Sequence, residues 1–181
     1  EVYIYSLENS QSVKINLPGD SDRYLARLKW IPGQQIVSVI SLNRLQNQMD
    51  IWHIDAKSGI ATTVYTEKSD TYIDFEEGDD LTYLSDGKTF ILSSEKTGFR
   101  HLYHYDFTGK VLNQLTKGDW QVTDLCGIDE KTGRVYFLST EVSPLVRHLL
   151  LGSALISATL SIISAAIYQP QKPPCMTQPV R

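Results

Sequence analysis

The chain has 181 residues, a formal net charge of −4 at pH 7 and 41% hydrophobic residues. This apolar content is sufficient for a buried core, and the mildly acidic balance excludes a basic surface for nucleic acid. Cys126 and Cys175 have neither CxxC spacing nor a neighbouring histidine, so no zinc site or disulfide framework is predicted. We therefore expect no nucleic-acid partner, no metal and no cofactor, and we interpret Cys126 as a small core residue.

The first sixteen residues predict a β-hairpin that closes an earlier repeat. The chain starts inside this hairpin, with no initiator methionine and no signal peptide. We therefore expect it to be a piece of a larger protein.

Three weakly similar copies of one unit follow, at 28–55, 81–106 and 125 to about 150. Each copy has a short strand, a glycine-bearing turn, an apolar second strand and a loop. In the first two copies a third strand then alternates in period two and ends at an aspartate. A fourth strand completes an antiparallel meander. The second strands are expected at 36–41, 90–94 and 135–139, the third at 51–55 and 102–106, and the fourth at 62–65 and 111–115.

A four-stranded unit that recurs at roughly 50 residues is typical of a β-propeller. A sandwich would lack this recurrence, and leucine-rich or helical repeats have shorter periods. The predicted fold is all-β: a partial propeller over 1–149, with blade repeats at about 21–70, 71–120 and 121–149, followed by an anomalous tail at 150–181. About three blades do not close a ring, so we expect the isolated chain to associate unless other protein covers its edges.

The repeat pattern stops abruptly in the third copy. Residues 147–149 match 100–102, but the alternation of the third strand is then lost. Residues 149–168 are uncharged and, at about 20 residues, long enough for a transmembrane helix. Two alternatives are a buried helix or strand pair of a divergent blade, and a tail foreign to the fold, such as a frameshift or cloning junction. The foreign tail is favoured, and the proline-rich end is predicted to be disordered.

No catalytic constellation is evident in the sequence. The GxSxG motif of hydrolase nucleophiles is absent. The four histidines lie on third strands or at their starts, where packed, hydrogen-bonded roles are expected, and the three tryptophans are interpreted as packing residues. The acidic run at 76–80 lies in a predicted inter-blade loop, where it either receives a cationic group or remains a solvated loop. The histidines are His53, His101, His104 and His148, and the tryptophans are Trp30, Trp52 and Trp120.

Several contiguous strings resemble the N-terminal propeller of the dipeptidyl peptidase IV family, bacterial branch. They are LTYLSDGKTFILSSEKTGFRHLYHYD at 81–106, QLTKGDWQVT at 114–123, and DIWHID at 50–55 with the preceding NRLQN at 43–47. The resemblance covers about residues 1–149. It implies a serine exopeptidase that removes Xaa-Pro or Xaa-Ala dipeptides from N-termini, with an eight-bladed propeller joined to an α/β-hydrolase domain.

The resemblance implies no catalytic residue in this chain, because the family's Ser, Asp and His lie in the hydrolase domain. Its substrate-binding glutamates lie upstream of the matched region. The weak substrate-binding candidates are Phe75, as a wall of the substrate pocket, and Glu76, as a cation partner where some relatives have arginine. The expected partners are the hydrolase domain, peptide substrates and, in a homodimer, a second copy.

The expected role is to gate substrate access, and the expected location is periplasmic, secreted or cell-surface. The alternative is a non-enzymatic periplasmic or cell-surface propeller that serves as a binding scaffold, either with or without a membrane anchor formed by residues 149–168.

Overall fold

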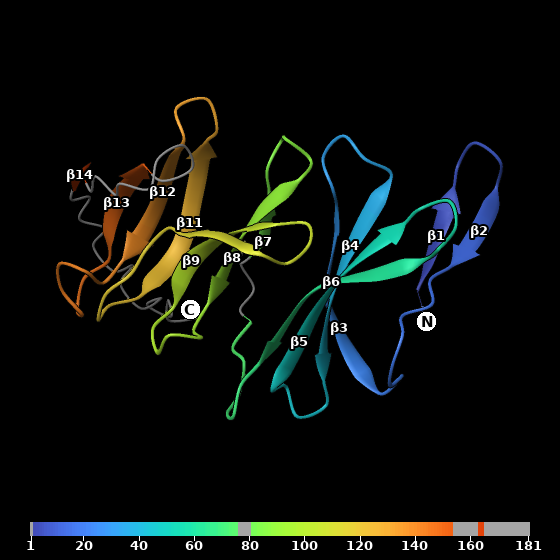
Figure 1. The fold of residues 1–181 in the computed structure, drawn as a ribbon, viewed down its shortest axis with the longest axis horizontal. Helices are drawn as coiled ribbons and strands as arrows, with labels where there is room; N and C mark the ends of the chain where they lie inside the picture. Colours follow the sequence, from blue (N-terminus) through green and yellow to red (C-terminus); the bar gives the residue numbers. More distant parts are fainter. Residues whose placement is uncertain (1, 76–80, 154–162, 165–181) are drawn as a thin grey trace, which may run out of the picture.

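The computed structural model describes residues 2–75, 81–153 and 163–164. Throughout these residues the regular structure is β-strand, arranged in four antiparallel sheets that succeed one another along the chain (Figure 1). One sheet has two strands and three have four. The predicted all-β architecture of consecutive propeller blades is confirmed.

The two-stranded sheet is the predicted N-terminal hairpin, β1 (Tyr3–Ser6) and β2 (Gln11–Lys14). The first four-stranded blade comprises β3 (Arg23–Trp30), β4 (Ile36–Asn43), β5 (Gln48–Asp55) and β6 (Ala61–Lys68). The second comprises β7 (Leu81–Tyr83), β8 (Thr89–Ser94), β9 (His101–Asp106) and β10 (Val111–Gln114). The third comprises β11 (Val122–Asp129), β12 (Arg134–Ser139), β13 (His148–Ser153) and β14 (Ile163–Ser164). In every blade the spatial order of strands follows the sequence order, as in a meander.

The central strands of the first two blades are buried on both faces. On the second strand β4, Ile40 and Leu42 pack toward the second blade, whereas Val37 and Val39 pack toward the N-terminal hairpin. Because side chains alternate across a strand, one apolar run supplies two separate cores. This explains why the second strands lack the apolar-polar alternation of a one-sided sheet.

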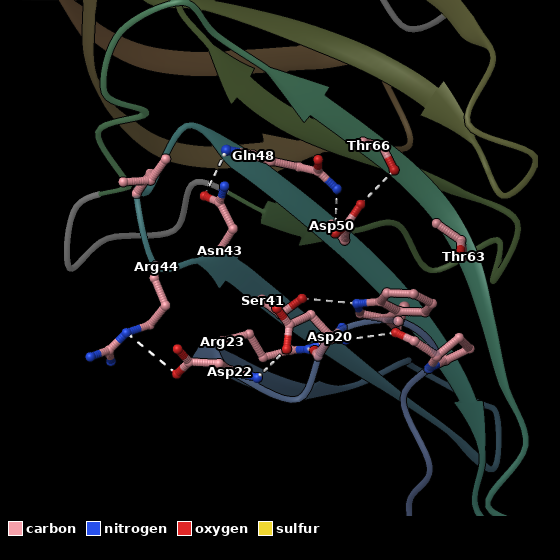
Figure 2. A pocket seen from close by; sticks show the side chains of 14 residues that line it. Asp20, Asp22, Arg23, Ser41, Asn43, Arg44, Gln48, Asp50, Thr63 and Thr66 are labelled. Atoms are coloured by element: carbon pink, nitrogen blue, oxygen red, sulfur yellow. Dashed lines mark hydrogen bonds and ion pairs between the residues drawn. The ribbon is translucent and has the colours of Figure 1, made fainter.

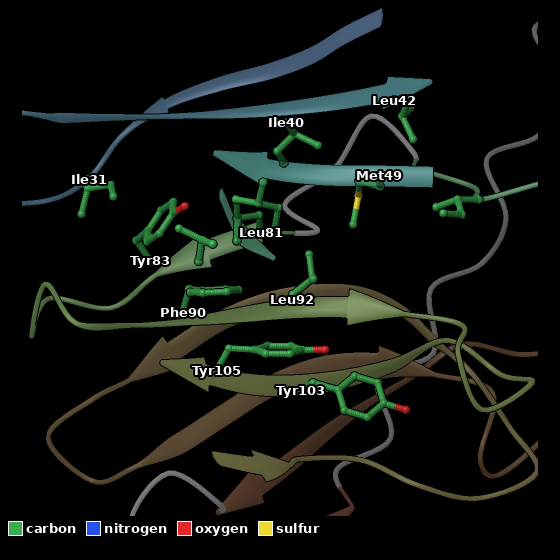
Figure 3. Close-up of a cluster of buried hydrophobic side chains, with 13 residues drawn as sticks. Ile31, Ile40, Leu42, Met49, Leu81, Tyr83, Phe90, Leu92, Tyr103 and Tyr105 are labelled. Atoms are coloured by element: carbon green, nitrogen blue, oxygen red, sulfur yellow. The ribbon is translucent and has the colours of Figure 1, made fainter. Parts of the chain in front are cut away.

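The largest core lies between the first and second blades. Figure 3 shows its side chains filling the space between β4 and β5 on one side and β7, β8 and β9 on the other. The rings of Phe90 and Tyr105 stack with centroids 5.2 Å apart and planes at 8°. Smaller cores join the hairpin to the first blade and the second blade to the third. The buried members of the largest core are Ile31, Ile40, Leu42, Met49, Ile51, Val64, Ile73, Leu81, Tyr83, Phe90, Leu92, Tyr103 and Tyr105.

The turn after β9 brings the second blade into close contact with the first. The Asp106 carboxylate accepts hydrogen bonds from the backbone N–H groups of Thr108 (2.8 Å) and Lys110 (3.1 Å), which fixes the hairpin. Gly109 follows with a φ of +80°, in the left-handed region, and a Cβ at this position would overlap the Val64 carbonyl of the preceding blade. This turn therefore requires glycine for both its backbone conformation and its packing.

The third blade continues past the point where the sequence repeat is lost. All six residues of β13 pair with β12, from Arg134 opposite Ser153 to Ser139 opposite His148. His148 therefore takes the place in its blade that His101 takes opposite Ser94. Within 149–168, residues 149–153 belong to β13 and residues 163–164 form β14, which pairs with Leu150 and Leu151. The other tail residues, with the rest of the proposed span and the proline-rich end, lie outside the described residues.

Two residues expected in the interior are instead exposed. Trp30 is 61% exposed because it is the last residue of β3, which is an edge strand of its sheet. Cys126 is exposed because it occupies a register shift between Leu125 and Gly127, where β11 bulges against β12. The packing interpretation holds for Trp52, which is buried, and for Trp120, whose ring stacks on Phe137.

Candidate functional site

Two pockets lie at equivalent positions in successive repeats. Each pocket is lined by the connection that enters a blade and by the loop between the second and third strands of that blade. The first pocket lies at the first blade and the second pocket at the second blade. The first pocket has a volume of about 600 Å³ and the second about 410 Å³. The repeat thus offers the same cavity twice, with different side chains.

Polar side chains supply most of the residues that line the first pocket, and several of them are bonded to one another (Figure 2). The Asp50 carboxylate accepts hydrogen bonds from Thr66 Oγ1 (2.6 Å) and Gln48 Nε2 (3.1 Å). The Trp52 indole N–H donates to Ser41 Oγ at 3.0 Å. These mutual contacts link β4, β5 and β6, and the predicted wall residue Phe75 does not line this pocket.

The second pocket contains the sequence-predicted wall residue Phe75. Its side chain is half-buried and packs against the core between the first two blades. Met49 and Ile73 line the pocket beside it. Glu76, the other predicted substrate residue, lies outside the described residues. The apolar side of this pocket is therefore built from the first blade and from the connection that follows it.

The segment carrying Phe75 is fixed at the two residues that precede Phe75. Ile73 is buried, and its backbone N–H donates to the Gln46 carbonyl at 2.8 Å. The Arg100 guanidinium, whose side chain is 11% exposed, lies 3.5 Å from Asp74 Oδ2 and donates to the Asp74 carbonyl at 3.4 Å. The same guanidinium lies 3.7 Å from Glu95 Oε1. The second blade thus holds the segment in place from the opposite side of the pocket.

A chain of hydroxyl contacts links two charged residues of this pocket. Lys96 Nζ donates to the Tyr105 hydroxyl at 2.7 Å and lies 3.8 Å from the centroid of the Tyr103 ring. The Tyr105 hydroxyl donates to the Tyr65 hydroxyl at 3.1 Å, which donates to Glu67 Oε2 at 3.0 Å. Burial raises the pKa of Tyr105 to about 12 and also raises that of Tyr65, so both phenols stay protonated.

The buried histidines have packing partners, as the sequence predicted. His53 Nε2 lies 2.8 Å from the Tyr83 hydroxyl, and His101 contacts Thr116 Oγ1 and the Gly118 carbonyl, each at 3.1 Å. His104 differs because its buried Nε2 lacks a hydrogen-bond partner within the structure as described. Burial lowers the pKa of all three. They do not converge on one pocket, so they give no evidence for an acid-base centre.

Within residues 2–75, 81–153 and 163–164, no three histidine, cysteine, aspartate or glutamate side chains are grouped so as to hold a metal ion. The same residues include no apolar helix of the length needed to span a bilayer.

Sequence reasoning missed most of the second pocket. Lys96, Arg100 and Glu67 lie in loops or at strand ends, where single-sequence patterns carry little information. The repeat itself was a signal that could have located this pocket. In two successive units the loop between the second and third strands flanks the connection that precedes the blade.

Comparison with known proteins agrees with this fold. The family model described as "Dipeptidyl peptidase IV (DPP IV) N-terminal region" matches residues 1–151. The structure superposes on the crystal structure of Porphyromonas gingivalis dipeptidyl peptidase 4 with a TM-score of 0.79 and 30% identity, covering 87% of this chain and 22% of that one. The crystal structure of a putative dipeptidyl aminopeptidase IV from Bacteroides ovatus gives a TM-score of 0.73 and 25% identity, covering 86% of this chain and 24% of that one.

Curated relatives give the same result. A probable dipeptidyl peptidase 4 of Aspergillus clavatus is 29% identical over 143 residues, which is 76% of this chain and 18% of that protein. The inactive dipeptidyl peptidase 10 of Rattus norvegicus is 31% identical over 135 residues, which is 70% of this chain and 17% of that protein. The chain thus spans less than a quarter of the length of these relatives.

Together the repeated meanders and their inter-blade pockets define a β-propeller segment. The family match covers most of its length. The chain belongs to the dipeptidyl peptidase IV family, in the N-terminal propeller region.

Proposed function

We propose that this chain is part of the propeller of a serine dipeptidyl peptidase that releases Xaa-Pro or Xaa-Ala dipeptides from peptide N-termini. In this proposal the catalytic Ser, Asp and His belong to an α/β-hydrolase domain outside the chain, and the propeller controls which peptides reach them. The observation that supports it best is the fixed position of Phe75 in the pocket between the first two blades. The pocket brings an apolar wall and charged groups together at a size suited to a peptide side chain.

The chain by itself is expected to bind such peptides weakly and not to cleave them. Titration of the isotope-labelled chain with Ala-Pro-Ala-Ala-amide should shift backbone NMR signals of residues 72–75 and 94–100. Phe75→Ala should abolish these shifts, whereas Phe99→Ala, which removes a 39% exposed ring, should preserve them. Unchanged spectra in the millimolar range would contradict the peptide site. Release of a Gly-Pro dipeptide by the purified chain would contradict the assignment of catalysis to another domain.

A second candidate function is a non-enzymatic propeller that serves as a binding scaffold. It is favoured by one relative named as inactive, the rat protein that is 31% identical over 135 residues. The nucleotide sequence of the gene distinguishes the peptidase from the scaffold. A reading frame that continues into a domain with GxSxG supports the peptidase, whereas a homologous domain lacking the nucleophile supports the scaffold.

Location and assembly are part of the same proposal. A periplasmic, secreted or cell-surface protein that dimerises would fit either function. Fractionation of cells followed by a carbonate wash tests whether residues 149–168 anchor the protein, because a peripheral protein is released and a spanning one is retained.

A further inference from the structure

The charged residues around the second pocket are not equally neutralised. Arg100 lies within ion-pair distance of both Asp74 and Glu95. Lys96 is held differently, by the hydroxyl of Tyr105 and the face of the Tyr103 ring. Among the residues that the structure describes, no carboxylate lies within 4.0 Å of its ammonium group. The positive charge of Lys96 is therefore fixed in position, and none of the described carboxylates contacts it.

The nearest carboxylate along this network is already occupied. Glu67 accepts hydrogen bonds from Tyr65 at Oε2 and from Ser94 Oγ at Oε1, the latter at 2.8 Å. Two phenol groups separate it from Lys96. Partial burial lowers the pKa of Lys96, which Glu67 raises only in part, so removal of the ammonium from water is incompletely compensated. A ligand anion would supply the missing compensation.

The ammonium has donors available for such an anion. A lysine carries three N–H donors, and Tyr105 accepts one of them. The pocket beside it has an apolar wall that includes Phe75, Met49 and Ile73. A ligand suited to this arrangement presents an apolar group to the wall and a carboxylate to Lys96.

We propose that Lys96 makes the pocket between the first two blades selective for peptides that carry a carboxylate. This inference rests on the proposed function, since it specifies which peptides the same pocket prefers. A charge-assisted hydrogen bond to a partly buried ammonium is strong enough to give a preference of about tenfold for the carboxylate over the matching amide. The carboxylate belongs either to an acidic side chain or to the free C-terminus of a short peptide.

The test compares peptides that differ only in charge. Dissociation constants for the full chain are measured by NMR titration with Ala-Pro-Glu-Ala-amide and Glu-Pro-Ala-Ala-amide. Each peptide is compared with the counterpart in which Gln replaces Glu. Ala-Pro-Gln-Ala with a free C-terminus is compared with Ala-Pro-Gln-Ala-amide, and this pair reports on the terminal carboxylate. The acidic run at 76–80 is present throughout, so it affects both members of each pair alike. At least one peptide with the additional carboxylate should bind about tenfold more tightly than the matched peptide in which an amide replaces that carboxylate.

Matched variants assign the preference to one residue. Lys96→Met should remove it and Lys96→Arg should retain it, while Lys68→Met, which removes an exposed lysine from the rim of the same pocket, should leave it unchanged. Thermal unfolding of each variant checks that the fold is intact. Equal binding of Glu and Gln peptides by the wild-type chain, or equal loss in the Lys68 and Lys96 variants, would overturn the inference while leaving the peptide site standing. Failure of every peptide to bind would overturn the proposed function as well.

Discussion

The imidazole of His53 in the first blade and the hydroxyl of Tyr83 in the second lie 2.8 Å apart, and this contact crosses the core between the blades. The Tyr83 hydroxyl in turn donates to Ser38 Oγ at 2.7 Å, so that three polar side chains satisfy one another inside an apolar interface. The edge of the His53 ring lies against Phe107, with centroids 4.6 Å apart. A buried polar chain of this kind fixes how two blades align, because any shift would leave a donor or acceptor without its partner.

Stability should therefore fall as the pH is lowered. Burial lowers the pKa of His53 to about 4 in the folded chain, compared with an ordinary value of 6.5. Between these values the unfolded chain binds more protons, so stability is greatest above about pH 6.5 and decreases as the pH falls toward 4. His53→Gln retains a polar side chain without a titratable group and should flatten this part of the profile of urea midpoint against pH. His101 and His104, whose pKa values are also lowered, leave a residual slope. His148→Gln, outside this interface, serves as the control, and an unchanged profile for His53→Gln would contradict the prediction.

Gly109 should tolerate alanine poorly. Its φ of +80° disfavours any L-residue, and the new methyl group would meet the Val64 carbonyl. We expect Gly109→Ala to destabilise the chain by about 1–3 kcal/mol in urea unfolding. Gly33→Ala is the matched control, because φ is +70° there but nothing lies within 4 Å of the added Cβ. If the two variants lose the same stability, only backbone strain matters and the close approach of the blades does not.

Phe90 should be among the most sensitive core residues. It is fully buried and stacks on Tyr105 at the centre of the core between the blades. Truncation to alanine removes this packing and leaves a cavity, at a cost of about 3–5 kcal/mol. Phe99→Ala removes the same ring from a loop where it is 39% exposed, and it should change stability far less. Denaturant midpoints measured by far-UV circular dichroism compare the two, and a similar loss in both would count against the inter-blade core.

Arg100→Met should loosen the segment that carries Phe75 while leaving the blades folded. The substitution keeps much of the apolar stem and removes both the ion pair to Asp74 and the hydrogen bond to its carbonyl. Hydrogen exchange of the amides at 72–75 should accelerate several-fold, with little change in exchange from β8 and β9. Arg44→Met breaks an exposed ion pair to Asp22 and should not affect these amides. Unchanged exchange in the Arg100 variant would show that Ile73 alone fixes the segment.

The blade repeat could be predicted because it depends on local patterns. The alternation in 51–55 and 102–106 and the following Asp and Gly residues correspond to β5, β9 and their hairpin turns. The structure lengthens several strands, since β5 begins at Gln48 and β3 at Arg23. These extensions mix polar and apolar residues, and the register with a neighbouring strand includes most of them.

By itself the sequence determined the β-class and the meander of the blades, because side-chain alternation and turn chemistry act over a few neighbouring positions. Phe75 became a candidate wall residue only through the resemblance to the dipeptidyl peptidase IV family. Only the tertiary structure decided which faces are covered. It exposed Trp30 on an edge strand and Cys126 in a bulge, although both belong to strands whose pattern favoured burial. It also brought Arg100 to Asp74 and Lys96 to the pocket of Phe75, because such contacts depend on how two sheets stack and no local pattern encodes that geometry.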